Sequence, residues 1–349
     1  MINMKSLKDL SLQISEEQYR ENPALSYSLI ATYAKGGFAS IPHLYDKKES
    51  DALTFGSMVD TIITEGIERF QEKFVVADFK IPTDSIKEVI DYLLEIRTEE
   101  VFEGIPDDVV IAACNLKEYQ TRYKEETRLS KIKSEGETYY NTVRQIGNRT
   151  VVSDEVYQEV LAVVGALKGH TQTSKYLQQT EEGSNIEFLY QQKFLTNLDG
   201  LNVRCMFDLI IVNHAKKIII PIDLKTSSML EYDFPKKYLE NRYDLQSRLY
   251  CKILKNIIKE DDYFKDFTIT NFRFIVINKN NRLPLIFTDD YSFVEGDIEI
   301  KFKSGSKKIL RNPVTIGKEL RDYLNKESVV PEGIDIYGLN SIRKRLELL

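Results

Sequence analysis

The sequence predicts an α+β protein in which a mixed central sheet is flanked by helices. Three observations support this class. Beyond Gly183, the segments NIEFLYQQKFL, LNVRCMFDLIIVN and KKIIIPIDLKT are short, rich in β-formers and separated by turn residues, which predicts three consecutive antiparallel strands within 185–225. A further strand, NFRFIVINK, is expected at 271–279. Residues 84–180 instead show apolar stripes at helical spacing with charged opposite faces, which predicts a large helical section inserted before the strands.

The remaining elements follow in chain order. Residues 16–45 are expected to form a helix, a turn at Gly36–Gly37 and an extended stretch that ends at Pro42. The segment DALTFGSMVDTIITEG (51–66) predicts one helix, and a helical stretch is expected from about 235 to 260, between the strands. The tail from about 290 is weakly patterned. The expected organisation is a single domain over 1–300, with a helical insertion at about 80–180, followed by a C-terminal extension over 301–349.

Composition excludes several classes of protein. The 349 residues are 42% hydrophobic and 29% charged, which is typical of a globular chain and unlike a disordered or collagenous one. No apolar run reaches the roughly 18 residues of a membrane span, and the N-terminus lacks the apolar core of a signal peptide. The three cysteines are scattered, which argues against a disulfide framework, a zinc knuckle and a four-cysteine iron–sulfur cluster. We therefore expect a cytoplasmic protein with no membrane partner and no iron–sulfur cluster.

The strand IIIPIDLKT carries the residues with the clearest chemical meaning. Asp223 and Lys225 lie two positions apart, so they face the same side of the strand. Fifteen residues earlier, Asp208 interrupts the apolar run CMFDLII, and a turn near 213–217 would bring it close to Asp223 across a hairpin. Two neighbouring carboxylates suit Mg²⁺ or Mn²⁺, and a lysine beside them can orient water or stabilise charge on a phosphate. A salt-bridged pair at a strand end explains the same residues, and the pattern alone leaves both explanations open.

The pattern of Asp208 followed fifteen positions later by Asp223-Leu224-Lys225-Thr226 resembles the PD-(D/E)XK nuclease superfamily. The resemblance is strongest to its RecB-like and RecE-like exonuclease branch (exodeoxyribonuclease VIII-type, phage-type). That branch has a Gln-x-x-x-Tyr motif on the helix after the lysine strand, and NRYDLQSRLY supplies Gln246 and Tyr250. The N-terminal segments LSYSLIATYAKGGFASIPHLY and ALTFGSMVDTIITEGIERFQEKFVV also resemble the opening of RecE-type enzymes. The resemblance covers about 24–77 and 185–280.

The resemblance implies a restriction-endonuclease-like core and specific roles for these residues. Asp208, Asp223 and the backbone carbonyl of Leu224 would bind Mg²⁺, with Mn²⁺ as a substitute, and Lys225 would position or help to deprotonate the attacking water. Gln246 and Tyr250 would orient the lysine or contact the DNA backbone. Glu187, on the first strand, would be a supporting residue near the metal or a solvent-exposed strand residue.

Two departures from the family pattern stand out. The histidine of the Phe-Gly-x-x-x-His helix, a metal ligand in the family, is Asp60 here. Asp60 could complete the coordination of a hard cation, or it could mark a weakened site. The Gly of the usual Gly-x-x-Asp motif is Cys205, and the arginine often found two residues before the Asp is Met206, so Arg204 could substitute from another direction.

The charge distribution qualifies the acidic net charge of −6. Residues 201–260 hold eleven Lys/Arg and seven Asp/Glu, a local balance of +4. These basic residues form either solvated helix faces or a groove that follows phosphates. The predicted DNA-binding residues are Arg204, Lys236, Lys237, Arg242 and Arg248.

The resemblance implies a metal-dependent deoxyribonuclease, with double-strand-end exonuclease activity in phage-type recombination or repair as the preferred activity. An endonuclease or single-strand nuclease on the same core, or a non-catalytic DNA-binding protein, remains the alternative. DNA is the expected partner. A single-strand annealing protein and further copies of the chain are additional partners that the resemblance suggests, in a bacterial or phage-infected cell.

Overall fold

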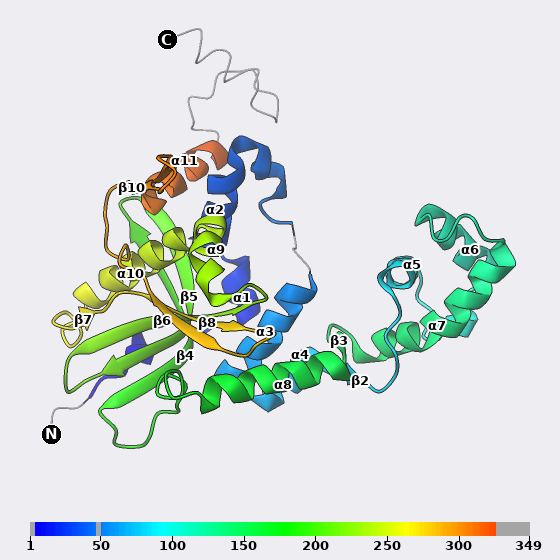
Figure 1. Ribbon diagram of the computed structural model, residues 1–349, viewed down its shortest axis with the longest axis horizontal. Coiled ribbons are helices and arrows are strands. Elements are labelled where there is room, and N and C mark those ends of the chain that lie inside the picture. Colours follow the sequence, from blue (N-terminus) through cyan, green and yellow to red (C-terminus); the bar gives the residue numbers. More distant parts are fainter. Residues whose placement is uncertain (1–3, 47–49, 326–349) are drawn as a thin grey trace, which may run out of the picture. The chain divides into compact units, whose positions relative to one another are not determined.

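The computed structural model describes residues 4–46 and 50–325, which belong to two compact units. Unit 1 combines the chain up to Thr64 with the chain from Val163 onward, and unit 2 is Glu65–Ala162. The helical section that the sequence predicts as an insertion is therefore largely a compact unit of its own. The two units are described separately below (Figure 1).

Unit 1 is built on a mixed seven-stranded sheet, which confirms the α+β class. Antiparallel pairing joins β4 to β5 and β5 to β6, whereas β6 pairs in parallel with β8, and β9 closes the path antiparallel to β8. Two short strands, β1 and β7, pair in parallel with β5 and β6. The strand bounds are β1 Leu25–Ser26, β4 Ile186–Leu198, β5 Leu201–Asn213, β6 Ile218–Ser227, β7 Thr268–Ile269, β8 Arg273–Asn278 and β9 Pro284–Thr288.

The three predicted antiparallel strands form because each turn supplies the backbone geometry that a tight hairpin needs. Between β4 and β5, Asp199 (φ 53°) and Gly200 (φ 85°) adopt the left-handed conformation that two-residue hairpins favour. Between β5 and β6, Asn213 Oδ1 accepts a hydrogen bond from the Lys216 amide at 2.9 Å. The register runs from Asn213↔Ile218 to Leu209↔Ile222, so the predicted hairpin is confirmed.

The long helix α10 is amphipathic and contacts β4 and β5. Leu245, Leu249 and Ile253 recur at helical spacing on its buried side and are fully enclosed in the core of unit 1. The helix α3 contacts β6 and β5, and a Cβ on Gly56 would lie 3.1 Å from Thr226 Oγ1, so the helix backbone lies close to the strand. The helices within unit 1 are α1 Glu16–Glu21, α2 Tyr27–Gly36, α3 Asp51–Thr64, α9 Phe234–Asn241, α10 Tyr243–Lys259 and α11 Pro313–Leu324, with 3₁₀ helices at Leu7–Leu10, Gly37–His43 and Glu231–Asp233. The expectation of an extended stretch up to Pro42 is therefore wrong, because this segment forms a 3₁₀ helix.

The first part of the predicted C-terminal extension belongs to the core of unit 1. A hairpin of β10 (Ile298–Lys301) and β11 (Lys307–Leu310) precedes α11, which contacts α2, α10 and β5. Gly317 of α11 allows this approach, because a Cβ there would lie 2.6 Å from a methyl group of Leu201. Residues 326–349, including the basic run 343–345, lie outside the described residues.

Unit 2 is mostly helical, as its apolar stripes predict, and has its own core. Side chains from α5, α6 and α7 bury Ile90, Leu93, Val110 and Tyr140 together. A short parallel ribbon pairs β2 with β3. The elements are α4 Ile67–Lys73, β2 Phe74–Ala77, α5 Asp84–Ile96, a 3₁₀ turn at Phe102–Gly104, α6 Asp107–Leu116, α7 Glu125–Ile146, β3 Thr150–Ser153 and the first part of α8 (Asp154–Gly169).

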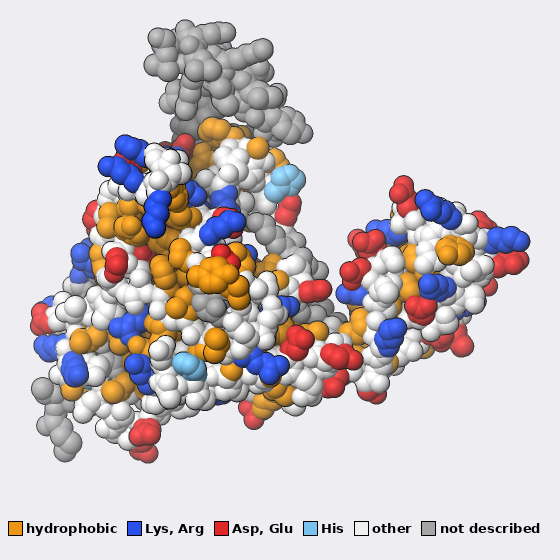
Figure 2. All heavy atoms as spheres, viewed as in Figure 1, with side chains coloured by type: hydrophobic (Ala, Val, Ile, Leu, Met, Phe, Trp, Pro, Cys, Tyr) orange, Lys and Arg blue, Asp and Glu red, His pale blue; other side chains and the backbone are white. Residues whose placement is uncertain are grey.

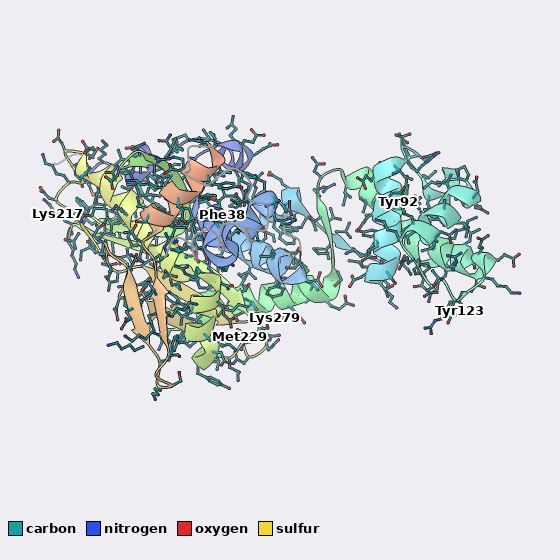
Figure 3. The ribbon with its side chains drawn as sticks, turned by 90° about the horizontal axis from the view of Figure 1, so that it is seen from above. Phe38, Tyr92, Tyr123, Lys217, Met229 and Lys279 are labelled. Carbon is teal, nitrogen blue, oxygen red and sulfur yellow. The ribbon has the colours of Figure 1, made fainter. Side chains whose placement is uncertain are left out.

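Replacing Phe102 by Ala should destabilise unit 2 by about 3–5 kcal/mol, because the ring is buried and packs edge-on against Tyr140 with centroids 5.7 Å apart. Hydrogen exchange measured by mass spectrometry should become faster in α5 and α7 and stay unchanged in β5 and β6 of unit 1. Tyr123→Ala is the matched control, since this tyrosine is exposed at the surface of unit 2 (Figure 3). Equal acceleration in both units would contradict separate cores.

Candidate metal and catalytic site

Asp208 and Asp223 lie on neighbouring strands at the end of the β5–β6 ladder. The last paired residues of this ladder are Leu209 and Ile222. Asp208 is the next residue beyond Leu209 on β5, and Asp223 is the next residue beyond Ile222 on β6. Asp208 Oδ2 accepts a hydrogen bond from the Leu224 amide at 2.8 Å, so the Asp208 side chain of β5 is bound to the backbone of β6. The local geometry therefore directs the Asp208 carboxylate toward β6 and next to Asp223.

Asp223 is a buried carboxylate with two side-chain partners, Lys225 on the same strand and Gln246 on α10. It is 3% exposed, its Oδ2 forms an ion pair with Lys225 Nζ, and its Oδ1 accepts a hydrogen bond from Gln246 Nε2 of α10. Lys225 Nζ also lies 5.2 Å from the centre of the Tyr243 ring, a cation–π distance. The salt bridge between Asp223 and Lys225, one of the two explanations that the sequence allows, is therefore present. Gln246 of α10 contacts the same carboxylate.

The electrostatics of the cluster are dominated by three acidic side chains and one lysine. Burial raises the pKa of Asp208 well above its usual range, and the charges of Asp223 and Asp60 raise it further. Burial alone would lower the pKa of Lys225, but the charges of Asp223, Tyr243 and Asp208 and the hydrogen bond to Asp223 together outweigh it, and the pKa is raised. At neutral pH the lysine is thus held in its charged form beside carboxylates that repel one another.

Asp60 reaches the cluster from α3 and is held by Gln191, a residue that the sequence patterns do not single out. Gln191 Nε2 donates hydrogen bonds to Asp60 Oδ2 at 3.0 Å and to Thr64 Oγ1 at 3.1 Å. Gln191 has a φ of 51° and lies opposite Asp208, between the ladder pairs Tyr190↔Leu209 and Gln192↔Phe207. The signal available in the sequence was the pair of adjacent glutamines inside the strand segment FLYQQKF.

The donor chemistry of this cluster fits a hard divalent cation. Across residues 4–46 and 50–325, no three His, Cys, Asp or Glu side chains stand together as a complete ligand set. The charges of Asp60 and Asp223 nevertheless act directly on Asp208, and all three side chains offer only oxygen. Oxygen donors suit Mg²⁺ or Mn²⁺, and a cation would relieve the repulsion that raises the Asp208 pKa. Asp60, Asp208, Asp223 and the carbonyl of Leu224 would hold it.

Gln246 and Tyr250 both lie on α10, one turn apart, but in different surroundings. Gln246 is in direct contact with Asp223. Tyr250 is buried between aromatic rings, with its centroid 5.0 Å from Phe207 and 6.5 Å from Tyr27, and burial raises its pKa well above the usual range. This placement supports a packing role for Tyr250, and the prediction that it contacts the DNA backbone finds no support in it.

Glu187 does not lie beside the carboxylate cluster, so the prediction of a supporting role there is not supported. Its Oε2 lies 3.1 Å from His214 Nε2 and accepts a hydrogen bond from the Leu7 amide at 3.4 Å. His214, an isolated histidine in the sequence, is buried, and its Nδ1 lies 3.0 Å from the Tyr263 hydroxyl. These contacts hold the N-terminal 3₁₀ turn against β4 and β5.

Three of the five predicted DNA-binding residues are enclosed and already paired. Arg204 donates to the carbonyls of Ala24 and Tyr19 and stacks on the Tyr19 ring at 4.8 Å. Arg242 forms two hydrogen bonds with the buried Asp244. Arg248 is 2% exposed and donates to three backbone carbonyls. Because buried guanidinium groups need such partners, Arg204 and Arg248 hold backbone carbonyls, Arg242 holds Asp244, and none of the three is available to a phosphate.

Lys236 and Lys237, by contrast, lie on α9 with solvent access. Lys236 is exposed and 3.9 Å from Glu240, a separation at which an exposed ion pair contributes little. Both ammonium groups are therefore able to meet an anionic ligand.

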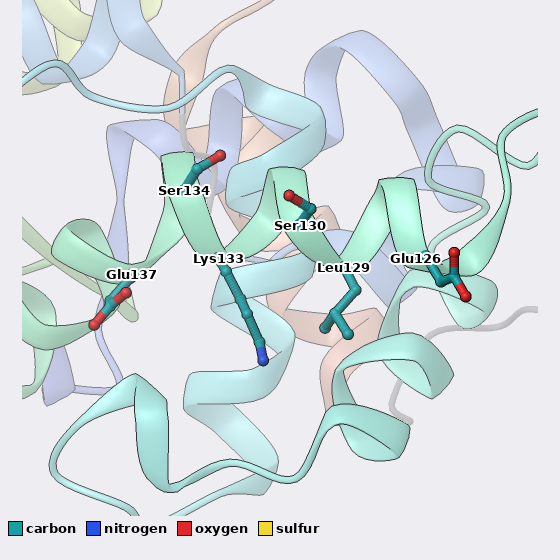
Figure 4. A pocket seen from close by; sticks show the side chains of 6 residues that line it. All are labelled: Glu126, Leu129, Ser130, Lys133, Ser134 and Glu137. Carbon is teal, nitrogen blue, oxygen red and sulfur yellow. The ribbon is translucent and has the colours of Figure 1, made fainter.

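A separate pocket lies along α7 in unit 2 (Figure 4). It contains none of the predicted catalytic residues and is lined by Glu126, Leu129, Ser130, Lys133, Ser134 and Glu137. Lys133 Nζ is paired with Asp107 at 2.6 Å. The pocket belongs to unit 2, whereas the residues of the carboxylate cluster belong to unit 1.

The fold and the site define an α+β protein whose mixed sheet brings two aspartates and a lysine together beside a glutamine of α10. No protein-family model matches the chain, and comparison with curated proteins finds no match. Within the described part of the chain, no helix is both long and apolar enough to cross a membrane.

Proposed function

We propose that this protein is a Mg²⁺-dependent deoxyribonuclease with a PD-(D/E)XK core. One observation carries the proposal: Asp208 and Asp223 lie next to each other at the end of the β5–β6 ladder, with Lys225 and Gln246 in contact with Asp223. A salt bridge that served only stability would need one carboxylate. The additional carboxylates of Asp208 and Asp60 raise the electrostatic cost, which a bound cation would offset.

Each residue has a role that follows from its position. When bound, the cation would supply Lewis-acid activation of water and of the scissile phosphate. Asp60, Asp208 and Asp223 would hold it, and Gln191 would fix the orientation of Asp60 through its amide. Lys225, kept charged by Asp223, would donate hydrogen bonds to the attacking water or to phosphate oxygens. Gln246 would keep Asp223 oriented as Lys225 moves between carboxylate and substrate.

The preferred substrate is an end of double-stranded DNA, in recombination or repair. Incubation of the full chain with Mg²⁺ or Mn²⁺ and either a linear duplex or a covalently closed circle tests this. Degradation of the linear duplex alone supports an exonuclease, and nicking of the circle indicates an endonuclease. If neither DNA is cleaved with either metal, while the protein still binds the duplex, the chain is a non-catalytic DNA-binding protein and the proposal fails.

Asp60→Ala should reduce metal-dependent cleavage by about a hundredfold or more, because it removes one of three carboxylates from the proposed ligand set. Titration with Mn²⁺, followed by calorimetry, should show weaker binding than in the wild-type protein. Asp51→Ala, at the exposed first residue of the same helix, is the matched control and should leave both measurements unchanged. Cleavage at the wild-type rate by Asp60→Ala would remove this residue from the site.

A further inference from the structure

The β10–β11 hairpin, residues Ile298–Leu310, concentrates positive charge at the surface of unit 1. We call it the basic hairpin. It carries Lys301, Lys303, Lys307 and Lys308 and a single acidic residue, Glu299. Figure 2 shows Lys and Arg side chains interspersed with hydrophobic ones in the region where Figure 1 labels β10 and α9.

The charge arrangement within the basic hairpin is unfavourable on its own. Lys301 and Lys307 are directly opposite each other across the two strands, a position in which like charges destabilise a hairpin. Both side chains are mostly exposed, and both share one carboxylate, Glu299, at 3.5 and 3.2 Å. An anionic partner would relieve this repulsion.

The basic hairpin is fixed to the helices that border the candidate site. The buried Arg248 of α10 donates to the carbonyls of Val294, Gly296 and Arg311, which flank the hairpin on both sides. Lys308 Nζ donates to the Leu239 carbonyl of α9 at 3.2 Å. The helix α10 also carries Gln246 and Tyr243, which meet Asp223 and Lys225. The helix α10 therefore connects the basic hairpin to the carboxylate cluster, because it contacts both.

The end of the basic hairpin adds exposed apolar side chains to its charge. Phe302, directly after Lys301, and Ile309 of β11 are 39% and 50% exposed. The lysines supply positive charge for backbone phosphates, and the apolar side chains beside them add contact area. Lys236 and Lys237 on the neighbouring α9 extend the positive surface.

We propose that the basic hairpin is a DNA-binding element in which Lys301, Lys303 and Lys307 contact backbone phosphates. The choice of DNA as the anion rests on the proposed function. The hairpin would hold the DNA outside the carboxylate cluster, so its contribution should be to affinity, independent of bound metal.

The test is the affinity of the full chain for a fluorescent 30-base-pair duplex, measured by anisotropy in EDTA, where metal-dependent cleavage is absent. The triple variant Lys301→Ala, Lys303→Ala, Lys307→Ala should bind about tenfold more weakly or worse at moderate salt. The slope of log affinity against log salt should fall by about 2–3, at about 0.9 for each phosphate that a lysine no longer neutralises. The triple arginine variant at the same positions should retain binding, which separates the loss of charge from a loss of folding.

The matched control is Lys216→Ala, Lys259→Ala, Lys265→Ala, three exposed lysines on other elements of unit 1. It removes the same charge and should change affinity less than about twofold. Equal losses in both triple variants, or an unchanged slope in the hairpin variant, would overturn the proposal. So would loss of binding to phosphatidylserine vesicles with duplex affinity intact, because the partner would then be a lipid surface. Failure of the nuclease proposal is distinguishable, since it would abolish cleavage with Mg²⁺ and leave the EDTA binding difference in place.

Discussion

Asp208→Asn is expected to abolish Mg²⁺-dependent DNA cleavage, by at least about a thousandfold, and at the same time to stabilise the metal-free protein. Activity is lost because the variant removes a proposed ligand. Stability is gained because ionising Asp208 is unfavourable in the folded state, where burial and the charges of Asp223 and Asp60 raise its pKa. An amide of the same shape carries no such penalty and can still accept the hydrogen bond from the Leu224 amide.

The raised pKa of Asp208 also predicts how the stability of the metal-free protein changes with pH. A carboxyl with a raised pKa in the folded state binds more protons there than in the unfolded state, so stability falls as pH rises above the ordinary aspartate pKa of about 4. In EDTA, the wild-type protein should therefore lose stability from about pH 4 upward toward the raised pKa, and Asp208→Asn should reduce this slope. Near pH 7 we expect a gain on the order of 1 kcal/mol, or about 2–4 °C in melting temperature.

Thermal denaturation with and without Mg²⁺ checks both halves of the prediction. Mg²⁺ should raise the melting temperature of the wild-type protein and have little effect on Asp208→Asn. Asp266→Asn, an exposed aspartate 3.8 Å from Lys217, is the matched control and should alter neither cleavage nor the response to Mg²⁺. A destabilised Asp208→Asn protein in EDTA would show that the carboxylates do not strain the fold.

Lys225→Met is the second large-effect prediction, and it should separate catalysis from metal binding. Cleavage should fall by about a hundredfold or more, because the charged donor that faces the water or phosphate is lost. In EDTA the variant should be less stable by about 2–3 kcal/mol, because Asp223 loses its ion-pair partner in a buried position. Because the pKa of Lys225 is raised in the folded state, this contribution is undiminished up to the ordinary lysine pKa of about 10 and is lost gradually as pH rises from there through the raised pKa.

Adding Mg²⁺ should restore most of the lost stability, since a cation replaces the missing positive charge, but it should not restore cleavage. Calorimetric titration with Mn²⁺ should show affinity equal to or tighter than that of the wild-type protein, because the lysine and the metal use the same carboxylate, Asp223. The control Lys216→Met changes an exposed lysine and should behave as wild type. Loss of Mn²⁺ binding in Lys225→Met would mean that the lysine supports the ligand set and is not a competitor for it.

The repeating patterns of the sequence correctly predict the parts of the fold that depend on local spacing. The strand segments 185–225, the hairpin at 213–217, the helix at 51–66 and the helical stretch at 235–260 are all present, because alternation, turn residues and apolar stripes are local properties. The helical stretch is divided into α9 and α10 at Arg242, whose φ is 58°. The same spacing predicts the approach of Asp208 to Asp223, since a hairpin with a known turn fixes which residues lie opposite each other. Gln246 was identified through the motif resemblance, and its contact with Asp223 agrees with that position.

Other features depend on tertiary contacts between residues that are distant in the chain. A sequence shows that Arg204, Arg242 and Arg248 are basic, but only the folded chain surrounds them with carbonyls and Asp244 and so removes them from the surface. Glu187 pairs with His214 across two strands, and Gln191 meets Asp60 over 131 positions of chain. Charge, residue type and spacing were therefore determined by the sequence alone. Which charges face solvent and which hold backbone in place was decided by tertiary structure, because burial makes an unpaired charge too costly and selects the partners that the packing provides.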